Sequence, residues 1–353
     1  MLKNFLRRVL ERGDRLALPL TTATGWIASL YYLVFNPRFR REQRAVLAGR
    51  AAYEQEVGAA VHSSPLLRRN VHRLEKGLIM RPRQPAFAED YIEETVEAFL
   101  RLEASETLDA AELRWAREVL RAYFAAVSDT APIARARHRF ESRGDANRDQ
   151  TTGATGAASR PQPRESGVRS GIDFEQFFSL CRQRRSVRWF GDAPVPRELV
   201  LKALQAAAQA PSACNRQPFL FRYFERADDA QRVAGLAMGT TGYAGQIPAL
   251  VVVLGDLSCF PHERDRHVIY IDASLAAMQF MLALETLGLA SCPINWPDVE
   301  SLERRMAREL SLPRHLRPVM LIALGYPDPQ GGIPASVKKP PESLLRLDDD
   351  YSA

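Results

Sequence analysis

Hydrophobic and polar positions follow different patterns in the two halves of the chain. Between residues 42 and 127, apolar residues recur every three or four positions, as at Leu113, Ala116 and Leu120, which is the spacing of one helix face. After residue 172, short apolar runs such as ALVVVLGD alternate with helical segments, which indicates strands packed between helices. The pattern therefore predicts a helical first half and an α+β second half.

Individual elements follow from the same pattern. In the first half we expect helices over 42–60, 89–103 and 109–127, and a further helix in which Gly77 is the C-cap. The helix expected over 266–287 is apolar nearly all round, as is typical of helices buried in a domain centre or a dimer interface. The segments expected as strands in the second half are VRWF, FLFRYF, ALVVVLGD, ASCPINW and PVMLIALGYP.

A polar segment separates the two halves. Residues 142–171 are rich in Gly, Ser, Thr, Pro and Arg and contain almost no large apolar residue. Such a segment cannot bury enough apolar surface to offset the entropy lost on ordering. We therefore expect a flexible linker there, between a helical region over 1–141 and a second domain over 172–347.

Charge is concentrated at the start of the chain. Residues 1–50 carry ten Lys or Arg against three acids in a protein of net charge +6, so the remainder is nearly neutral and no nucleic-acid surface is expected. Within this basic region, residues 16–35 carry no charge, but Pro19, Gly25 and modest apolar content favour a buried or interfacial helix over a membrane span. A cytoplasmic protein with peripheral contact to the inner face of a membrane is the expectation.

Several kinds of chemistry lack their sequence signatures. The four cysteines lie far apart with no C-x-x-C pair, which argues against a disulfide framework and a zinc knuckle. There is no Walker A loop, no nucleophile elbow and no H-E-x-x-H motif. His262 and His267 have no further ligands at useful spacing, so no metal site is predicted.

Four motifs in the second half carry candidate chemistry. The arginines of RRSVRWF suit phosphate, because a planar guanidinium donates two hydrogen bonds at once. The hydroxyl and amides of APSACNRQPF suit the carbonyl and imide edge of a heterocycle. In LGLASCPI, Pro293 leaves one face of the backbone bare for a flat ring, and the KKP that follows LIALGYP is a second candidate phosphate site.

In this order, the motifs resemble the nitroreductase family of FMN-dependent oxidoreductases, over residues 173–346. The resemblance implies a three-layer α+β sandwich, with a central mixed sheet flanked by helices, and a homodimer with FMN at each of two subunit interfaces. It also implies ping-pong electron transfer from NAD(P)H through FMN to an electron-poor small molecule, either nitroaromatic or quinone-like. No catalytic residue of the protein is expected, because the flavin carries the chemistry.

The resemblance also implies roles for individual residues. At the pyrimidine edge of the flavin, a fixed cation stabilises the charge that reduction creates. In the commonest family pattern the last phosphate site is an arginine, whereas this chain has lysine. The implied FMN-binding residues are Arg184, Arg185 and Ser186 at the phosphate and ribityl chain, Arg188 at the pyrimidine edge, Pro211, Ser212, Asn215 and Gln217 at the partner subunit's flavin, Pro293 and Ile294 at the ring, and Lys338 or Lys339 at the phosphate.

Two other functions remain open at this point. One is a specialised flavin enzyme of the same fold, such as a dehydrogenase or a dehalogenase. The other is a membrane-associated accessory or scaffold protein that retains the flavin fold for dimerisation. The helical half has no counterpart in the minimal family. One segment of it either lines the substrate side of the flavin pocket or is a capped helix on the surface. The residues that would line the pocket are His72, Arg73, Glu75 and Lys76.

Overall fold

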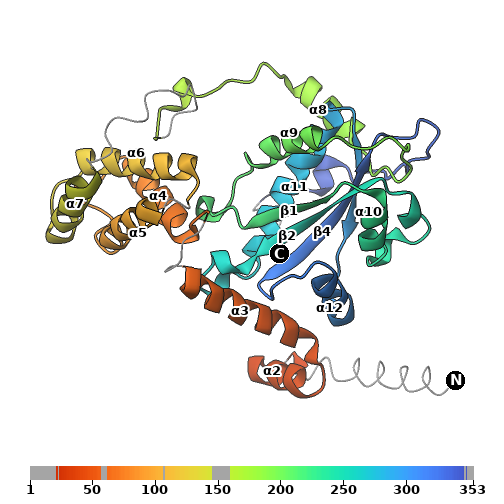
Figure 1. Cartoon of the computed structure of the whole chain (residues 1–353), viewed down its shortest axis with the longest axis horizontal. Coiled ribbons are helices and arrows are strands. Elements are labelled where there is room, and N and C mark those ends of the chain that lie inside the picture. Colours follow the sequence, from red (N-terminus) through yellow and green to blue (C-terminus); the bar gives the residue numbers. More distant parts are fainter. Residues whose placement is uncertain are drawn as a thin grey trace.

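The computed structural model describes residues 21–22, 24–56, 62–105, 108–144, 160–345 and 347. A helical unit formed by α4 to α7 stands beside an α+β domain, and an arm formed by α2 and α3 runs along one end of that domain (Figure 1). The helices are α2 (Gly25–Val34), α3 (Arg40–Glu56), α4 (Pro65–Leu78), α5 (Ile92–Ser105), α6 (Ala110–Ala126), α7 (Ala131–Gly144), α8 (Phe174–Gln183), α9 (Arg197–Ala207), α10 (Ala227–Ala234), α11 (Val268–Thr286) and α12 (Glu300–Glu309).

The α+β class predicted from the sequence is confirmed, and its sheet has four strands in the order β1-β2-β4-β3. All three strand pairings are antiparallel, so these strands do not form the mixed sheet that we expected. Ser186 makes a parallel bridge to Ser291, and the expected strand VRWF that follows it forms only an isolated bridge, from Phe190 to Pro327. The strands are β1 (Phe219–Phe224), β2 (Ala249–Asp256), β3 (Ala290–Asn295) and β4 (Leu316–Gly325).

Helices cover both faces of the sheet and produce the three layers (Figure 1). Alternate residues of β2 point to opposite faces, so Val251 and Val253 pack with α9 and α11, whereas Leu250 and Val252 pack with α10 and α12. Every residue of β2 from Ala249 to Gly255 is buried. The sheet therefore carries two hydrophobic cores, one on each face.

The helical unit has a core of its own. Ser64 caps α4 by accepting a hydrogen bond from the amide of Leu67, and Asp109 caps α6. Gly77 is not the expected C-cap, because α4 continues to Leu78. A Cβ at Gly77 would lie 2.1 Å from the ring of Phe87, so tight packing accounts for the glycine. Helix α7 was not predicted, and it includes the first residues of the expected linker.

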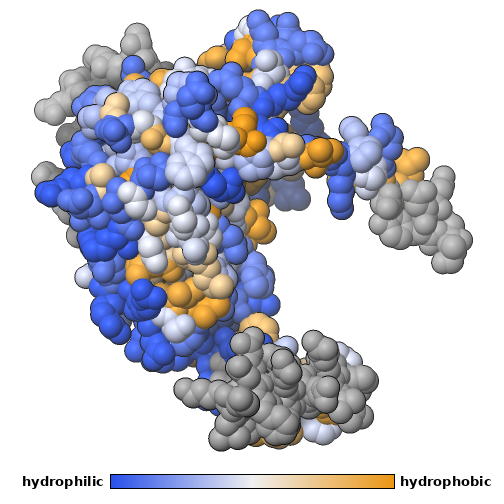
Figure 2. All heavy atoms as spheres, turned by 90° about the vertical axis from the view of Figure 1, so that its right-hand side faces the viewer, coloured by the Kyte–Doolittle hydropathy of each residue, from blue (hydrophilic) through white to orange (hydrophobic). Residues whose placement is uncertain are grey.

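One face of α11 is not covered within the chain. Ile271, Leu275 and Met278 are 58%, 43% and 38% exposed, and they share a face because they are spaced by four and three residues. Hydrophobic residues also gather in patches on the otherwise largely hydrophilic surface in Figure 2. Among the described residues, one helix is long and apolar enough to cross a membrane, over Glu263–Thr286, and 44% of that window is buried. It includes α11, which packs on the sheet as a core helix.

The arm is fixed to the α+β domain by both apolar and charged contacts. Ala45 and Val46 of α3 pack against Leu257 in the 3₁₀ turn that follows β2. Arg41 donates to Asp298 at 3.0 Å and also pairs with Glu303. Burial, together with the nearby Arg317, lowers the pKa of Arg41 to about 10. Helix α2 contains no buried residue, and residues 16–20 and 23 of the expected interfacial helix lie outside the described residues.

Candidate functional site

The first arginine motif lies where α8 ends and the chain crosses to β3. Arg185 donates to the carbonyl of Pro334 at 2.6 Å, and Arg188 donates to the carbonyl of Ser186 at 3.3 Å. The Nε of Arg184 and the Oγ of Ser291 are buried and have no hydrogen-bond partner. These two atoms belong to adjacent segments, because Val187 donates to the carbonyl of Ser291 at 3.0 Å. The motif therefore places three arginines in a segment next to the buried Ser291 hydroxyl, which has no hydrogen-bond partner.

A phenol and a thiol lie beside Arg188. Its guanidinium carbon is 5.9 Å from the centre of the Tyr243 ring, and the Tyr243 hydroxyl is 4.0 Å from the Sγ of Cys292. Burial, with a smaller contribution from Cys292, raises the pKa of Tyr243 to about 12. Burial also raises the pKa of the Cys292 thiol. Both groups are therefore neutral at physiological pH, and Arg188 supplies the charge in this part of the site.

The second motif forms a tight turn before β1. Cys214, Asn215 and Gln217 have φ values of 53°, 52° and 52°, which is the left-handed region that side chains other than glycine rarely adopt. Within the turn, the Ser212 Oγ accepts from the Gln217 amide at 3.1 Å, and Gln217 donates to the Asn215 Oδ1 at 2.9 Å. The turn thus orients the amide side chains that we assigned to a ligand, at the cost of backbone strain.

Asp272 fixes the turn to the start of α11. Its Oδ2 accepts from the amide of Ala213 at 2.9 Å. Burial raises the pKa of Asp272, and the Ala213 amide together with Arg216 opposes that rise. Arg216 is itself buried, stacks 4.9 Å from the centre of the Phe260 ring and leaves its Nε without a partner. The base of the turn therefore consists of buried charged groups.

The two motifs lie at opposite ends of α11. The turn contacts Asp272 in the first part of the helix, whereas Gln183, next to the arginine motif, donates to Glu285 near its end at 3.4 Å. Thirteen residues of α helix separate these contacts, which corresponds to about 20 Å. One chain therefore does not bring the two motifs together around one small ligand.

The remaining motif residues differ in how far they are buried. Pro293 is half-buried in β3, opposite Ile322 of β4. Ile294 is 3% exposed, and its side chain packs in the core on the α10 face, which leaves its backbone as the part that could adjoin a ring. Lys338 and Lys339 are exposed, and they follow the segment whose carbonyls accept from Arg185.

Sequence reasoning missed a contact from the helical unit. The Nε of Arg68, on α4, donates to the carbonyl of Asn215 at 2.8 Å. Of the α4 residues that we considered, Arg73 stacks 3.6 Å from the centre of the Tyr91 ring, and Glu75 accepts from Trp115. Both contacts lie within the helical unit. Nothing in the local sequence distinguishes Arg68, because its partner lies 147 residues away.

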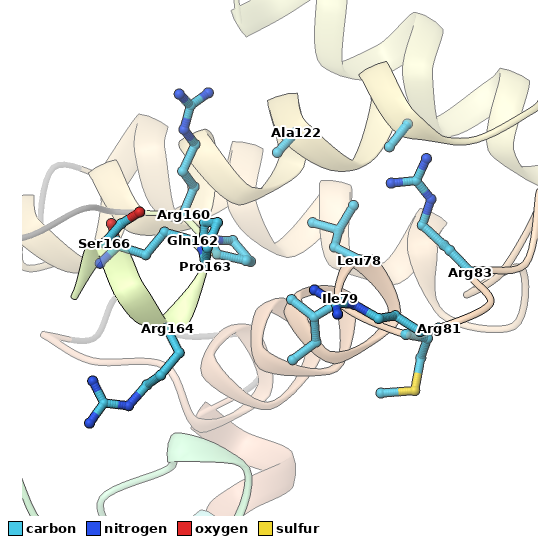
Figure 3. A pocket seen from close by; sticks show the side chains of 13 residues that line it. Leu78, Ile79, Arg81, Arg83, Ala122, Arg160, Gln162, Pro163, Arg164 and Ser166 are labelled. Carbon is cyan, nitrogen blue, oxygen red and sulfur yellow. The ribbon is translucent and has the colours of Figure 1, made fainter.

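Two cavities, of about 760 and 860 Å³, lie away from these motifs, and they share Arg81, Pro163 and Arg164. In the cavity of about 760 Å³, residues 160–166 face the end of α4 and the side of α6. The side chains of Arg160 and Arg164 point in opposite directions there (Figure 3). Guanidinium groups that diverge in this way do not form one anion site. These cavities are therefore not the candidate functional site.

The fold and motifs described above define the class of protein. The profile of the Nitroreductase family matches residues 181–245 and 238–326, and the chain belongs to this family. A protein of Methanothermobacter thermautotrophicus that is named as an NADH dehydrogenase/NAD(P)H nitroreductase is 31% identical over 152 residues, which are 41% of this chain and 74% of that protein. The helical unit lies outside the residues matched by the family profile.

Other relatives carry different names. A Thermotoga neapolitana protein named iodotyrosine deiodinase is 26% identical over 178 residues, which are 44% of this chain and 90% of that protein. A nitroreductase-named protein of Desulfovibrio desulfuricans, solved in complex with FMN, is 26% identical with a TM-score of 0.42, over 48% of this chain and 95% of that one.

Proposed function

We propose that the chain is an FMN-dependent oxidoreductase that transfers electrons from NAD(P)H to an electron-poor small molecule, nitroaromatic or quinone-like, by a ping-pong mechanism. The observation that carries this proposal is the arginine motif, where Arg184 and Ser291 hold buried polar atoms without partners inside the family-matched region. When bound, FMN supplies the redox chemistry, so the protein need not supply a general acid.

The residues present are suited to this group. Arg184, Arg185 and Ser186 offer guanidinium and hydroxyl donors to a phosphate and a ribityl chain, and the unpartnered Oγ of Ser291 adds a further donor next to them. Arg188 is a fixed cation beside the neutral Tyr243 and Cys292, so its charge is available to stabilise anionic character at the pyrimidine edge. Lys338 or Lys339 would add a point charge to the phosphate.

A homodimer reconciles the two motifs. Because they lie about 20 Å apart along α11, the turn at Ser212 and Asn215 can serve the same flavin as the arginines only if it comes from the other subunit. The exposed apolar face of α11 at Ile271 and Leu275 supplies a surface for that association. The proposed site therefore combines the arginine motif of one protomer with the polar turn of its partner.

Purification tests the proposal directly. The isolated protein should show flavin absorbance bands, or should acquire them on addition of FMN, and Arg184→Ala should weaken FMN binding by about tenfold or more because a charge-assisted contact is lost. Arg182→Ala, two residues earlier and exposed on α8, serves as the matched control. A colourless protein that does not bind added FMN would overturn the proposal.

A specialised reaction of the same fold is the second candidate, and the relative named iodotyrosine deiodinase favours it. Turnover of NAD(P)H with a quinone supports the reductase. A bound flavin that is photoreducible but does not turn over NAD(P)H, together with loss of halide from a halogenated phenol, supports the dehalogenase. Either enzyme should lose its cellular phenotype with Arg188→Ala and Asn215→Ala, whereas a scaffold protein should keep it.

We also propose that the arm makes peripheral contact with a membrane at the cytoplasmic side. The apolar side chains of α2 are exposed, including Trp26 and Leu33, and Arg38 and Arg40 follow them directly, which suits an anionic lipid surface. Flotation with anionic vesicles should carry the full chain but not a variant with Trp26→Ser and Leu33→Ser. Equal flotation of the two proteins would contradict this localisation.

A further inference from the structure

Arg68 connects the helical unit to the polar turn. Its Nε donates to the Asn215 carbonyl at 2.8 Å, and its Nη1 donates to Glu112 at 2.6 Å. The guanidinium carbon also lies 5.5 Å from the centre of the Trp115 ring. A planar guanidinium donates in fixed directions, so these contacts together determine where the Asn215 carbonyl lies relative to α4 and α6.

Glu112 holds Arg68 in place from the opposite side. Its side chain is 3% exposed and accepts from the Ser63 hydroxyl at 2.7 Å and from the Ser64 amide at 3.0 Å. Ser64 is the N-cap of α4, and Glu112 lies in the first turn of α6. The donor to the turn is therefore anchored on the starts of two helices, and is not a free surface side chain.

The turn requires contacts of this kind. Because Cys214, Asn215 and Gln217 are all left-handed, their backbone conformation persists only where surrounding groups hold it. The contact from Asp272 reaches the amide of Ala213, before the strained residues. Arg68 reaches the carbonyl of Asn215, among them, and so orients the peptide plane that follows Asn215 and with it the direction of the Asn215 side chain.

We propose that Arg68 is a positioning residue, through which the helical unit holds Asn215 in the orientation that it needs to contact the flavin of the partner subunit. This inference deepens the proposed function and rests on it. The helical unit then contributes to the flavin site through Arg68, and its packing against the turn influences the affinity for FMN. Arg68 does not itself touch the reacting atoms.

Arg68→Lys is the decisive variant. Lysine keeps a positive charge beside Glu112 but cannot donate in two fixed directions, so it gives up the Asn215 contact. Arg69→Lys is the matched control, because Arg69 lies on the same helix and pairs with Glu94 at 3.3 Å without contacting the turn. In Arg68→Lys we expect amide hydrogen exchange over residues 213–217 to become about tenfold faster, and FMN binding about tenfold weaker. We expect neither change in Arg69→Lys, with similar thermal midpoints for the two variants.

Other outcomes overturn the inference. Unchanged exchange over residues 213–217 in Arg68→Lys, or an equal change in Arg69→Lys, means that Arg68 does not position the turn. If the wild-type protein binds no FMN, the proposed function fails, while the exchange measurement still decides the role of Arg68. If Arg68→Lys does not fold, the double variant Arg68→Met with Glu112→Gln removes both charges at similar volume, and the same change in exchange is expected.

Discussion

The helical unit and the α+β domain differ in how many of their large apolar side chains remain exposed. Over residues 62–105 and 108–144, the large apolar residues that remain exposed are Ile79 and Met80. The α+β domain, in contrast, exposes residues of α8 and α11 that share helix faces, including Phe174, Phe178 and Leu275. Contiguous apolar surface of this kind marks an interaction site. The comparison indicates that the helical unit buries its apolar residues by itself, whereas the α+β domain exposes apolar faces that suit the second copy proposed above.

Disruption of the exposed face of α11 should have the largest effect on this comparison. Leu275→Glu places a charge in the expected dimer interface, and we expect loss of the dimer and of bound FMN, because a buried unpaired charge costs several kcal/mol. Sedimentation velocity and flavin absorbance measure the two effects. Ile79→Glu, on the helical unit, is the control and should leave both unchanged. A Leu275→Glu protein that remains a flavin-bound dimer would refute the assignment of this face.

The packing of the helical unit is tested at Gly77. Gly77→Ala puts a Cβ 2.1 Å from the ring of Phe87, and overpacking of this kind typically costs about 1–3 kcal/mol of unfolding free energy. Gly191→Ala is the control, because nothing lies within 4 Å of its Cβ position. Urea unfolding of the two variants measures the difference. Equal stability would show that the helical unit is more loosely packed than its buried core indicates.

Two buried serines sharpen the comparison further. Ser64 caps α4, so Ser64→Ala should cost about 1 kcal/mol of unfolding free energy. The Ser291 hydroxyl has no partner, so Ser291→Ala should change the stability of the FMN-free protein by about 0 kcal/mol or stabilise it slightly. Thermal and urea unfolding of FMN-free protein distinguish the two. An equal loss in both variants would mean that Ser291 has a structural role.

The smallest expected effect concerns pH. Burial raises the pKa of Asp272, so the folded protein binds its proton more tightly than the unfolded chain does. The unfolding free energy should therefore fall as pH rises from the pKa of an exposed Asp, about 3.9, through the raised pKa. Asp272→Asn should lose this component of the pH dependence, whereas Asp228→Asn, an exposed residue of α10, should not. Urea unfolding at a series of pH values decides, and parallel curves for wild type and Asp272→Asn would contradict the prediction.

Hydrophobic spacing predicted the fold where long segments have a clear period. The helix expected over 266–287 spans Val268–Thr286, and that expected over 109–127 spans Ala110–Ala126. Helix α7 was missed because charged residues interrupt its apolar face, although Ile133, Ala136 and Phe140 have helical spacing and are buried. Gly77 was misassigned as a cap, because sequence alone does not show the ring of Phe87 that approaches it.

The candidate site was less accessible from sequence than the fold. Arg184 and Asn215 could be found from the sequence, because each belongs to a short continuous motif whose residue types suggest ligand binding. The separation of these motifs along α11, and the contact from Arg68, depend on how distant segments pack. No local pattern encodes such a relation, so a single sequence cannot specify it.

The attachment of α3 has a consequence for how the chain folds during synthesis. Arg41 binds Asp298, which lies 257 residues further along the chain, and such distant contacts form late because a long loop must first close. The helical unit, with its local contacts, can fold as soon as it leaves the ribosome. Helix α3 is synthesised before the helical unit, yet it cannot dock until its partner residues near the end of the chain have been synthesised. Helix α3 would then be among the last elements to dock, and its apolar surface would stay available to chaperones in the meantime.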